Sequence, residues 1–363
     1  MNPTDDIGNR ILRLVFNQTN SNLVAGTSKG FRIVRLEDCK ITSRRDKESE
    51  LHFPGGFTCL APMFSTQLIC LVGSRENPRY HPNVVYFWDE YQVDMKGEIR
   101  FRSEVKNVLI RRDKVVIILQ NMTYVYELNN LKPVASISTI DNTNGVGSIS
   151  YDKDRFVLGT LDTKPGWIRI ENFSGGGFKT ASIHENPIAI LSIDFSGTYG
   201  ATASEQGTII RVFDCITLDI LHELRRGSSA AKISALVFSP DHSFLISSSN
   251  RATIHAWNIK NFQSVSVSGA ISKLLPTYFQ YQRSFAKLNL PPEVAWTCPT
   301  TIDEGPKACF ANETDFFVAH LDGNLYKCQI NETQNTITVL DTKPFLNFNE
   351  TIVEGERQWT SFE

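Results

Sequence analysis

Two adjacent arginines, Arg225 and Arg226, lie in the stretch LHELRRGSS at residues 221–229. Apolar, alternating segments stand on both sides of the pair, and Gly227 and two serines follow it directly. Guanidinium groups bind phosphate through paired, charge-assisted hydrogen bonds, so the pair is a candidate anion site. Basic pairs are also common as solvated surface charges. The residues around the pair decide between these two interpretations.

A sequence repeat places matched polar residues on either side of the pair. PIAILSIDFSGTYGATASEQGTII begins at Pro187, and KISALVFSPDHSFLISSSNRATIH begins at Lys232, which gives a spacing of 45 residues. Successive side chains of an extended strand point to opposite faces, so the two arginines are expected to serve different sites. The first predicted anion site contains His184, Ser204, Thr208 and Arg225, and the second contains Arg226, Ser229, Ser249, Thr253 and His255.

These residue types suit anion binding better than catalysis. Arginine supplies a bidentate donor, hydroxyls add further donors, and histidine can add a positive charge near neutral pH. Neither set holds a carboxylate or an ordered nucleophile and base. Residues 210–290 contain nine Lys or Arg and four Asp or Glu, whereas the whole chain has a net charge of −2. The hydroxyls have a structural alternative, because each of them can instead bond to the backbone of its own sheet.

Other chemistry has little support in the sequence. The seven histidines show no HExxH or other metal-ligand spacing, and no phosphate-binding loop of the Walker type occurs. The run Gly175–Gly177 lacks the Lys and Ser or Thr of such a loop and predicts a hairpin turn. We therefore expect no enzyme activity, metal or cofactor. The overall charge also favours no nucleic acid.

The elements that must position these residues are short strands. Runs such as NVVYFWD, VVIILQ, TYVYEL and TIIRVFD recur between Gly, Asn, Asp and Pro, and helical periodicity is nearly absent. Four short strands per period of about 45 residues are typical of a propeller blade. We predict an all-β, seven-bladed β-propeller with degenerate WD-like repeats, forming one domain over residues 1–363. Its blades should begin near residues 10, 56, 104, 145, 187, 232 and 294. Two β-sandwiches are the alternative, but no linker divides the chain.

One long segment interrupts the blade pattern at residues 260–282. It contains no Asp or Glu, and Ile271, Leu274 and Leu275 have the i, i+3, i+4 spacing of an amphipathic turn. We predict that it inserts into a membrane interface through Leu274, Leu275, Tyr278 and Phe279. The alternative is a loop that packs onto its own blade. No apolar run is long enough to span a bilayer, no secretory signal is evident, and the scattered cysteines favour reduced thiols in the cytoplasm.

Several of these segments resemble one known family. LRRG follows ASEQGTIIRVFD and precedes SSNRATIHAW, while LVFNQTNSNLVAGTSKGFRI and GSRENPRYHPNVVYFWDE resemble the first two blades of the PROPPIN family of phosphoinositide-binding β-propellers. The resemblance implies binding of phosphatidylinositol 3-phosphate and phosphatidylinositol 3,5-bisphosphate at two sites flanking the arginines, and membrane insertion of the blade-six loop.

The resemblance also carries expectations about partners and location. It implies a monomer that scaffolds autophagy and acts at vacuolar, endosomal and preautophagosomal membranes. Autophagy-related scaffold or lipid-transfer proteins are expected to bind the blade-two region around Arg75–Pro82. One departure concerns the second site, where the family usually reads S-D-K-G-T. This chain has Ser249-Asn250-Arg251-Ala252-Thr253, and the missing glycine predicts a changed hairpin.

Overall fold

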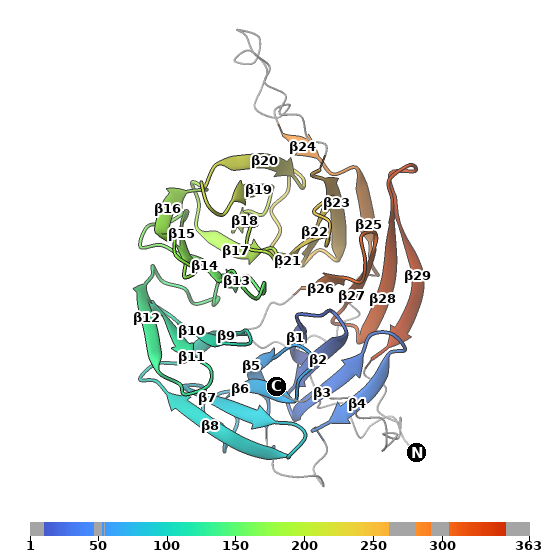
Figure 1. The fold of residues 1–363 in the computed structure, drawn as a ribbon. Helices are drawn as coiled ribbons and strands as arrows, with labels where there is room; N and C mark the ends of the chain where they lie inside the picture. Colours follow the sequence, from blue (N-terminus) through green and yellow to red (C-terminus); the bar gives the residue numbers. More distant parts are fainter. Residues whose placement is uncertain (1–10, 47–52, 54, 261–280, 292–304, 346–363) are drawn as a thin grey trace, which may run out of the picture.

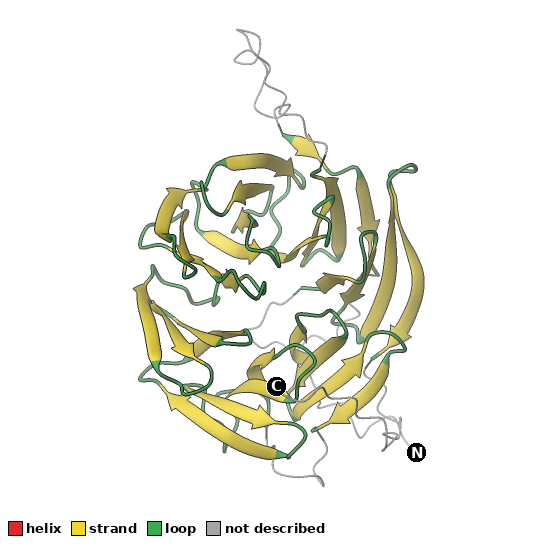
Figure 2. Ribbon diagram, viewed as in Figure 1, coloured by secondary structure: helices red, strands yellow, loops and turns green. Residues whose placement is uncertain are grey.

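The computed structural model describes residues 11–46, 53, 55–260, 281–291 and 305–345. Within these ranges every regular element is a β-strand, as Figure 2 shows, and none is a helix. The strands form small sheets that follow one another around a ring (Figure 1). The predicted all-β class and the seven-bladed β-propeller are confirmed.

The first four blades are antiparallel sheets whose four strands pair in chain order. Blade one contains β1 (Ile11–Phe16), β2 (Asn22–Thr27), β3 (Gly30–Arg35) and β4 (Lys40–Arg44). Blade two contains β5 (Phe57–Pro62), β6 (Leu68–Gly73), β7 (Val84–Asp89) and β8 (Asp94–Arg100). Blade three contains β9 (Val105–Ile110), β10 (Lys114–Leu119), β11 (Met122–Glu127) and β12 (Pro133–Ser138). Blade four contains β13 (Gly147–Ile149), β14 (Val157–Leu161), β15 (Trp167–Asn172) and β16 (Gly177–Ser182).

The last three blades depart from this regular order at one place. Blade five contains β17 (Ile188–Ile193), β18 (Tyr199–Ser204), β19 (Ile209–Asp214) and β20 (Ile220–Arg225), and its edge also pairs with β24 (Gln282–Arg283). Blade six contains β21 (Ile233–Phe238), β22 (Phe244–Ser249), β23 (Thr253–Asn258) and β25 (Ala286–Asn289). Blade seven contains β26 (Lys307–Phe310), β27 (Asp315–Ala319), β28 (Asn324–Asn331) and β29 (Thr336–Pro344).

The predicted blade boundaries lie close to the observed ones. The first strands of blades one to six begin within two residues of the predicted positions. The predicted start of blade seven, residue 294, lies outside the described residues. The additional strand β24 was not predicted, because a two-residue strand leaves no pattern in a sequence.

The hydrophobic core consists of clusters between neighbouring blades, which explains why inner strands are buried on both faces. Between blades five and six, Ala203 and Val212 from one sheet pack with Leu236 and Trp257 from the other. A similar cluster lies between blades four and five and includes Leu191 and Phe213. Each sheet therefore depends on its neighbours, and burial by stacking offsets the small size of each blade.

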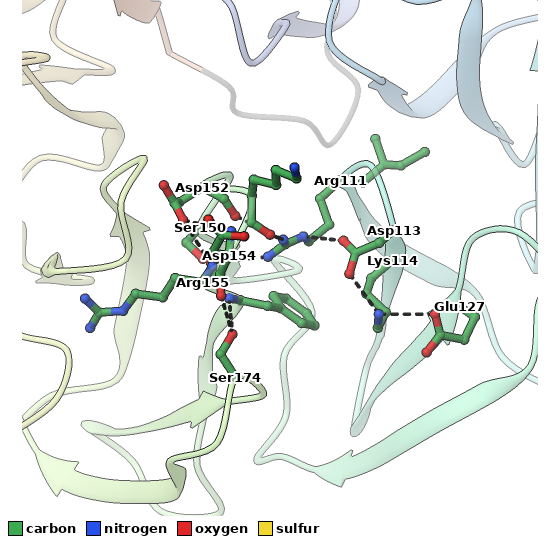
Figure 3. Close-up of polar contacts among 12 residues, drawn as sticks. Arg111, Asp113, Lys114, Glu127, Ser150, Asp152, Asp154, Arg155 and Ser174 are labelled. Atoms are coloured by element: carbon green, nitrogen blue, oxygen red, sulfur yellow. Dashed lines mark hydrogen bonds and ion pairs between the residues drawn. The ribbon is translucent and has the colours of Figure 1, made fainter. Parts of the chain in front are cut away.

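Polar side chains also join neighbouring blades. Arg111, which follows β9, is buried and reaches into the turn between the first two strands of blade four (Figure 3). Its guanidinium donates to the carbonyl oxygens of Asp152 at 3.0 Å, Lys153 at 3.2 Å and Arg155 at 3.3 Å. Its Nε lies 2.6 Å from Asp113 Oδ1. One side chain thus satisfies three backbone acceptors that the turn leaves without strand partners.

The ring closes between blade seven and blade one through side chains. Leu14 and Leu23 of blade one share a buried cluster with Ala319 and Leu325 of blade seven. Asn20 Nδ2 donates to the carbonyl oxygen of Phe310 at 2.9 Å. Among the described residues, the sheet of blade seven takes no strand from blade one.

Candidate functional site

The arginine pair lies at the end of β20, the outer strand of blade five, as predicted. Arg225 is opposite Ile209 of β19, and Arg226 follows the strand and donates its backbone N–H to Thr208 at 2.9 Å. Leu224 belongs to the cluster that faces blade six. Because side chains alternate along a strand, Arg225 faces the blade-four side, and Arg226 again faces the blade-six side.

The first predicted set gathers on the blade-four side of blade five. His184, in the link between β16 and β17, is 6% exposed. Its Nε2 lies 3.1 Å from Thr202 Oγ1, and its Nδ1 accepts a hydrogen bond from Arg211 Nη1 at 3.3 Å. Ser204 is two residues after Thr202 on β18 and so shares its face, as does Arg225. Thr208 lies in the hairpin at the same end of the sheet.

Three residues of this side were missed by the sequence interpretation. Thr202, Arg211 and Glu223 form a row across β18, β19 and β20. Arg211 Nε lies 2.6 Å from Glu223 Oε1, and Arg211 Nη1 donates to the carbonyl oxygen of Ile183 at 2.6 Å. This ion pair compensates the charge of Arg211. The alternation of side chains along a strand could have identified two of them. Thr202 and Glu223 stand two residues before Ser204 and Arg225, so each lies on the same face of its strand as the predicted residue.

The second predicted set gathers around Arg226, which is 9% exposed. Arg226 Nε donates to the carbonyl oxygen of Gly207 at 2.6 Å, and its Nη2 donates to the carbonyl oxygen of Ser229. Ser229 thus meets Arg226 through its backbone. In blade six, Ser249 Oγ and Thr253 Oγ1 are 2.9 Å apart, and His255 Nδ1 lies 2.9 Å from Ser284 Oγ.

The electrostatics of the two sets correct one expectation. Burial, followed by the charge of Arg211, lowers the pKa of His184 to about 4. Burial, followed by the charges of Arg226 and Lys287, lowers the pKa of His255 to about 4. Both histidines are therefore neutral at pH 7. Their part is hydrogen bonding, and the prediction that they add positive charge was wrong.

Basic residues that the prediction omitted surround the second set. Arg226 and Arg251 donate to the carbonyl oxygens of the adjacent residues Ser229 and Ala230. Burial, followed by the charge of Arg251, lowers the pKa of Arg226. Arg251 Nε donates to the carbonyl oxygen of Ala230 at 2.9 Å. Lys287 is opposite His255 in the pairing of β23 with β25. The Arg226 side thus collects Arg226, Arg251 and Lys287.

The hairpin that departs from the family pattern keeps its turn. Ala252 donates its N–H to Ser249 at 3.0 Å, as Gly207 donates to Ser204 at 2.9 Å in blade five. Both residues have left-handed backbone conformations, with φ of 53° at Ala252 and 58° at Gly207. The expected change of the hairpin is therefore absent from the turn, because the alanine adopts the conformation that glycine prefers.

Comparison with known proteins identifies the family. The family model described as PROPPIN matches residues 11–274. The chain belongs to the PROPPIN family. Autophagy-related protein 18e of Arabidopsis thaliana is 29% identical, with 94% of this chain and 90% of that protein covered. SVP1-like protein 2 of Pichia angusta is 27% identical, with 77% of this chain and 81% of that protein covered.

Solved structures support the same fold for this PROPPIN. Kluyveromyces lactis Hsv2 with its complete loop 6CD has a TM-score of 0.72 at 18% identity, with 93% of this chain and 99% of that chain covered. A complex of KlAtg21 with the coiled-coil of AgAtg16 has a TM-score of 0.73 at 20% identity, with 92% and 99% covered.

The predicted insertion residues of this PROPPIN lie outside the described part of the chain. Leu274, Leu275, Tyr278 and Phe279 all belong to residues 261–280. Among the described residues, no helix is long and apolar enough to cross a membrane. Nor does that part of the chain contain a group of three His, Cys, Asp or Glu side chains that could hold a metal ion.

The blade-two region contains a cavity of about 420 Å³. Its lining includes Arg79, Tyr80, Trp88 and Glu98. Tyr80 is buried between Phe53 and Tyr86, whereas Arg75 is exposed and pairs with Glu104 at 2.5 Å. The predicted segment Arg75–Pro82 thus combines a buried, tightly packed aromatic ring with an exposed charged side chain.

Proposed function

We propose that this PROPPIN is a non-enzymatic membrane-binding protein that recognises phosphatidylinositol 3-phosphate and phosphatidylinositol 3,5-bisphosphate. One observation carries the proposal. Arg225 ends β20 and Arg226 follows it, so strand alternation directs the two side chains towards different neighbouring blades. The faces of those blades carry separate sets of histidine and hydroxyl groups. Two phosphate groups can therefore be bound without competing for one guanidinium.

Each proposed headgroup site has an arginine at its centre. The first comprises His184, Ser204, Thr208 and Arg225, and the second comprises Arg226, Ser229, Ser249, Thr253 and His255. Hydroxyls and neutral histidines offer hydrogen bonds to the phosphate and inositol oxygens, while the arginines supply charge. Arg251 and Lys287 give the second site more positive charge nearby. This excess favours a more highly phosphorylated headgroup there.

A headgroup site alone gives weak and reversible attachment, so we assign a second membrane contact to residues 260–282. The segment leaves blade six after Lys260 and returns beside Arg225 through β24. Both headgroup sites and the ends of this segment thus lie at the edge of blades five and six. The propeller docks edge-on, with Leu274, Leu275, Tyr278 and Phe279 in the interface. The expected locations are vacuolar, endosomal and preautophagosomal membranes.

Titration calorimetry with soluble, short-chain phosphatidylinositol 3-phosphate tests this function. We expect two molecules bound per chain in the parent protein. Arg225→Ala and Arg226→Ala should each reduce the number to one, and the double variant should bind none. Saturation of the parent at a single headgroup would contradict the two-site arrangement.

The second candidate function is protein interaction at blade two, without any lipid function. The cavity near Tyr80 favours protein interaction, because aromatic rings next to charged side chains can hold a side chain of a bound peptide. The solved KlAtg21 complex contains a coiled-coil of AgAtg16. We propose an autophagy-related scaffold or lipid-transfer protein as the partner of this chain. Vesicle flotation separates the candidates, since a pure interaction propeller floats equally with and without 3-phosphoinositides.

A further inference from the structure

Strand β24 connects the two candidate headgroup sites, although its position in the sequence would place it in blade six alone. It stands between β23 and β25 in the sequence, and both of those strands belong to blade six. Yet β24 pairs in parallel with β20 of blade five, with Gln282 beside Leu224 and Arg283 beside Arg225. The chain therefore crosses to the edge of blade five and then returns to blade six.

This crossing is anchored on both sides. Gln282 Nε2 donates to the carbonyl oxygen of Asn258, at the end of β23, at 3.0 Å. Ser284 Oγ lies 2.9 Å from His255 Nδ1 in the second candidate site. Ala286 then pairs with Ala256 in blade six. The short segment thus pairs with β20 through Gln282 and Arg283 and contacts the His255 side chain through Ser284.

The pairing places two positive charges side by side. Neighbouring strands are about 4.8 Å apart, and side chains at paired positions project from the same face. Arg225 and Arg283 therefore project from the same face of the sheet, which puts two guanidinium groups within reach of one anion. A phosphate group accepts hydrogen bonds from two guanidinium groups at once, so one phosphate would link the two strands. A ladder of two residues provides few hydrogen bonds of its own, so a shared anion would add substantially to its stability.

We propose that Arg283 is the second guanidinium of the Arg225 site, and that one phosphate group binds between the two side chains and holds β24 on β20. This inference rests on the proposed headgroup function of the Arg225 site. Its ligand is a phosphate monoester with two negative charges. The site consequently spans two blades, because Arg283 belongs to the segment that returns to blade six.

The test isolates each site before changing Arg283. In an Arg226→Ala background, which retains the first site, Arg283→Gln should weaken soluble phosphatidylinositol 3-phosphate about tenfold, or about 1.4 kcal/mol. In an Arg225→Ala background, which retains the second site, the same change should alter the affinity less than about twofold. Arg102→Gln removes an exposed arginine from the link between blades two and three and should change neither affinity.

A second measurement follows the strand itself. Saturating the Arg226→Ala variant with the soluble lipid should slow hydrogen exchange at the amides of Gln282 and Arg283. Titration with inorganic phosphate alone should give much weaker binding than the lipid. Equal affinities would assign the site to free phosphate instead of a headgroup and overturn the inference.

The outcomes separate this inference from the function on which it rests. A parent protein that binds no phosphoinositide at either site refutes the proposed function. Two intact sites with no effect of Arg283→Gln on the first one refute only the role of Arg283. An equal loss at both sites also refutes it, since Arg283 would then act through the fold of the crossing. Unchanged hydrogen exchange in β24 would contradict the shared phosphate.

Discussion

Gly207→Ala is expected to damage the Arg226 site through the backbone. A Cβ atom at Gly207 would lie 1.9 Å from the carbonyl oxygen of Ala231, and the residue has a φ of 58°. The left-handed conformation costs an alanine about 1–2 kcal/mol, and displacing the backbone adds about 1–3 kcal/mol. We therefore expect a loss of about 2–5 kcal/mol in unfolding free energy, measured by urea denaturation.

The repeat supplies a matched control in blade six. Ala252 occupies the same position of the same turn, with a φ of 53°. Ala252→Gly relieves a strain of about 1 kcal/mol but loses a buried methyl of about 0.8 kcal/mol, so its stability should stay within about 1 kcal/mol of the parent.

The same two variants predict different binding. Gly207 accepts a hydrogen bond from Arg226 Nε, so moving its carbonyl should weaken headgroup binding at the second site by about tenfold. In an Arg226→Ala background, Gly207→Ala should weaken the remaining affinity less than it weakens the second site, because the Gly207 carbonyl accepts its hydrogen bond from Arg226. Equal unfolding midpoints for Gly207→Ala and the parent would refute the argument that this turn excludes a side chain.

The remaining predictions concern salt, the loop and pH. Vesicle affinity should fall as the NaCl concentration rises through 0.15 M, because exposed charges are screened, and a salt-independent part should remain from apolar insertion; complete insensitivity would contradict the role of the arginines. Replacing Leu274, Leu275, Tyr278 and Phe279 with serine should weaken vesicle binding about tenfold or more, since each buried apolar side chain contributes about 1.5–3 kcal/mol at most, while binding of the soluble lipid stays unchanged. Loop variants that float like the parent would favour a loop packed on its blade. The low pKa of His184 and of His255, both about 4, makes the unfolded state the stronger proton acceptor. Their contribution to stability is complete above pH 6.5 and is lost as pH falls from about 6.5 towards 4, so the urea midpoint should drop across this range. His184→Gln combined with His255→Gln should reduce that drop, and an unchanged pH profile would show that neither buried imidazole causes it.

The fold could be predicted from the sequence because the repeat and strand alternation are properties of local sequence. The spacing from Pro187 to Lys232 reappears in the first strands of blades five and six, which begin at Ile188 and Ile233. The opposite facing of Arg225 and Arg226 follows from the period of a strand. The prediction that the two arginines face separate groups of polar side chains needed only the repeat spacing and the alternation of side chains along a strand.

The features of the site that could not be predicted from the sequence depend on strand register and on burial. In blade five Ala203 pairs with Ile210, whereas in blade six Ser248 pairs with Ile254. A spacing of 45 residues would match Ser248 with His255, so the two hairpins differ by one residue. This difference places His255 on the face that bears Ser249, while its counterpart Ile210 is in the core. The neutral state of the histidines follows from burial, and the site contribution of Arg283 follows from a crossing between sheets.

The seam between blade one and blade seven has a consequence during synthesis of the chain. The hydrogen bond from Asn20 to Phe310 joins residues 290 positions apart, whereas the strands within each of blades one to four are consecutive in the chain. A ribosome that adds about 5–20 residues per second needs about 15–60 s to pass from one to the other. Throughout that time Leu14 and Leu23 lack the partners that cover them in the finished ring. Blade one is thus the longest-exposed apolar surface of the nascent protein, and a chaperone that acts during translation would have its main task there.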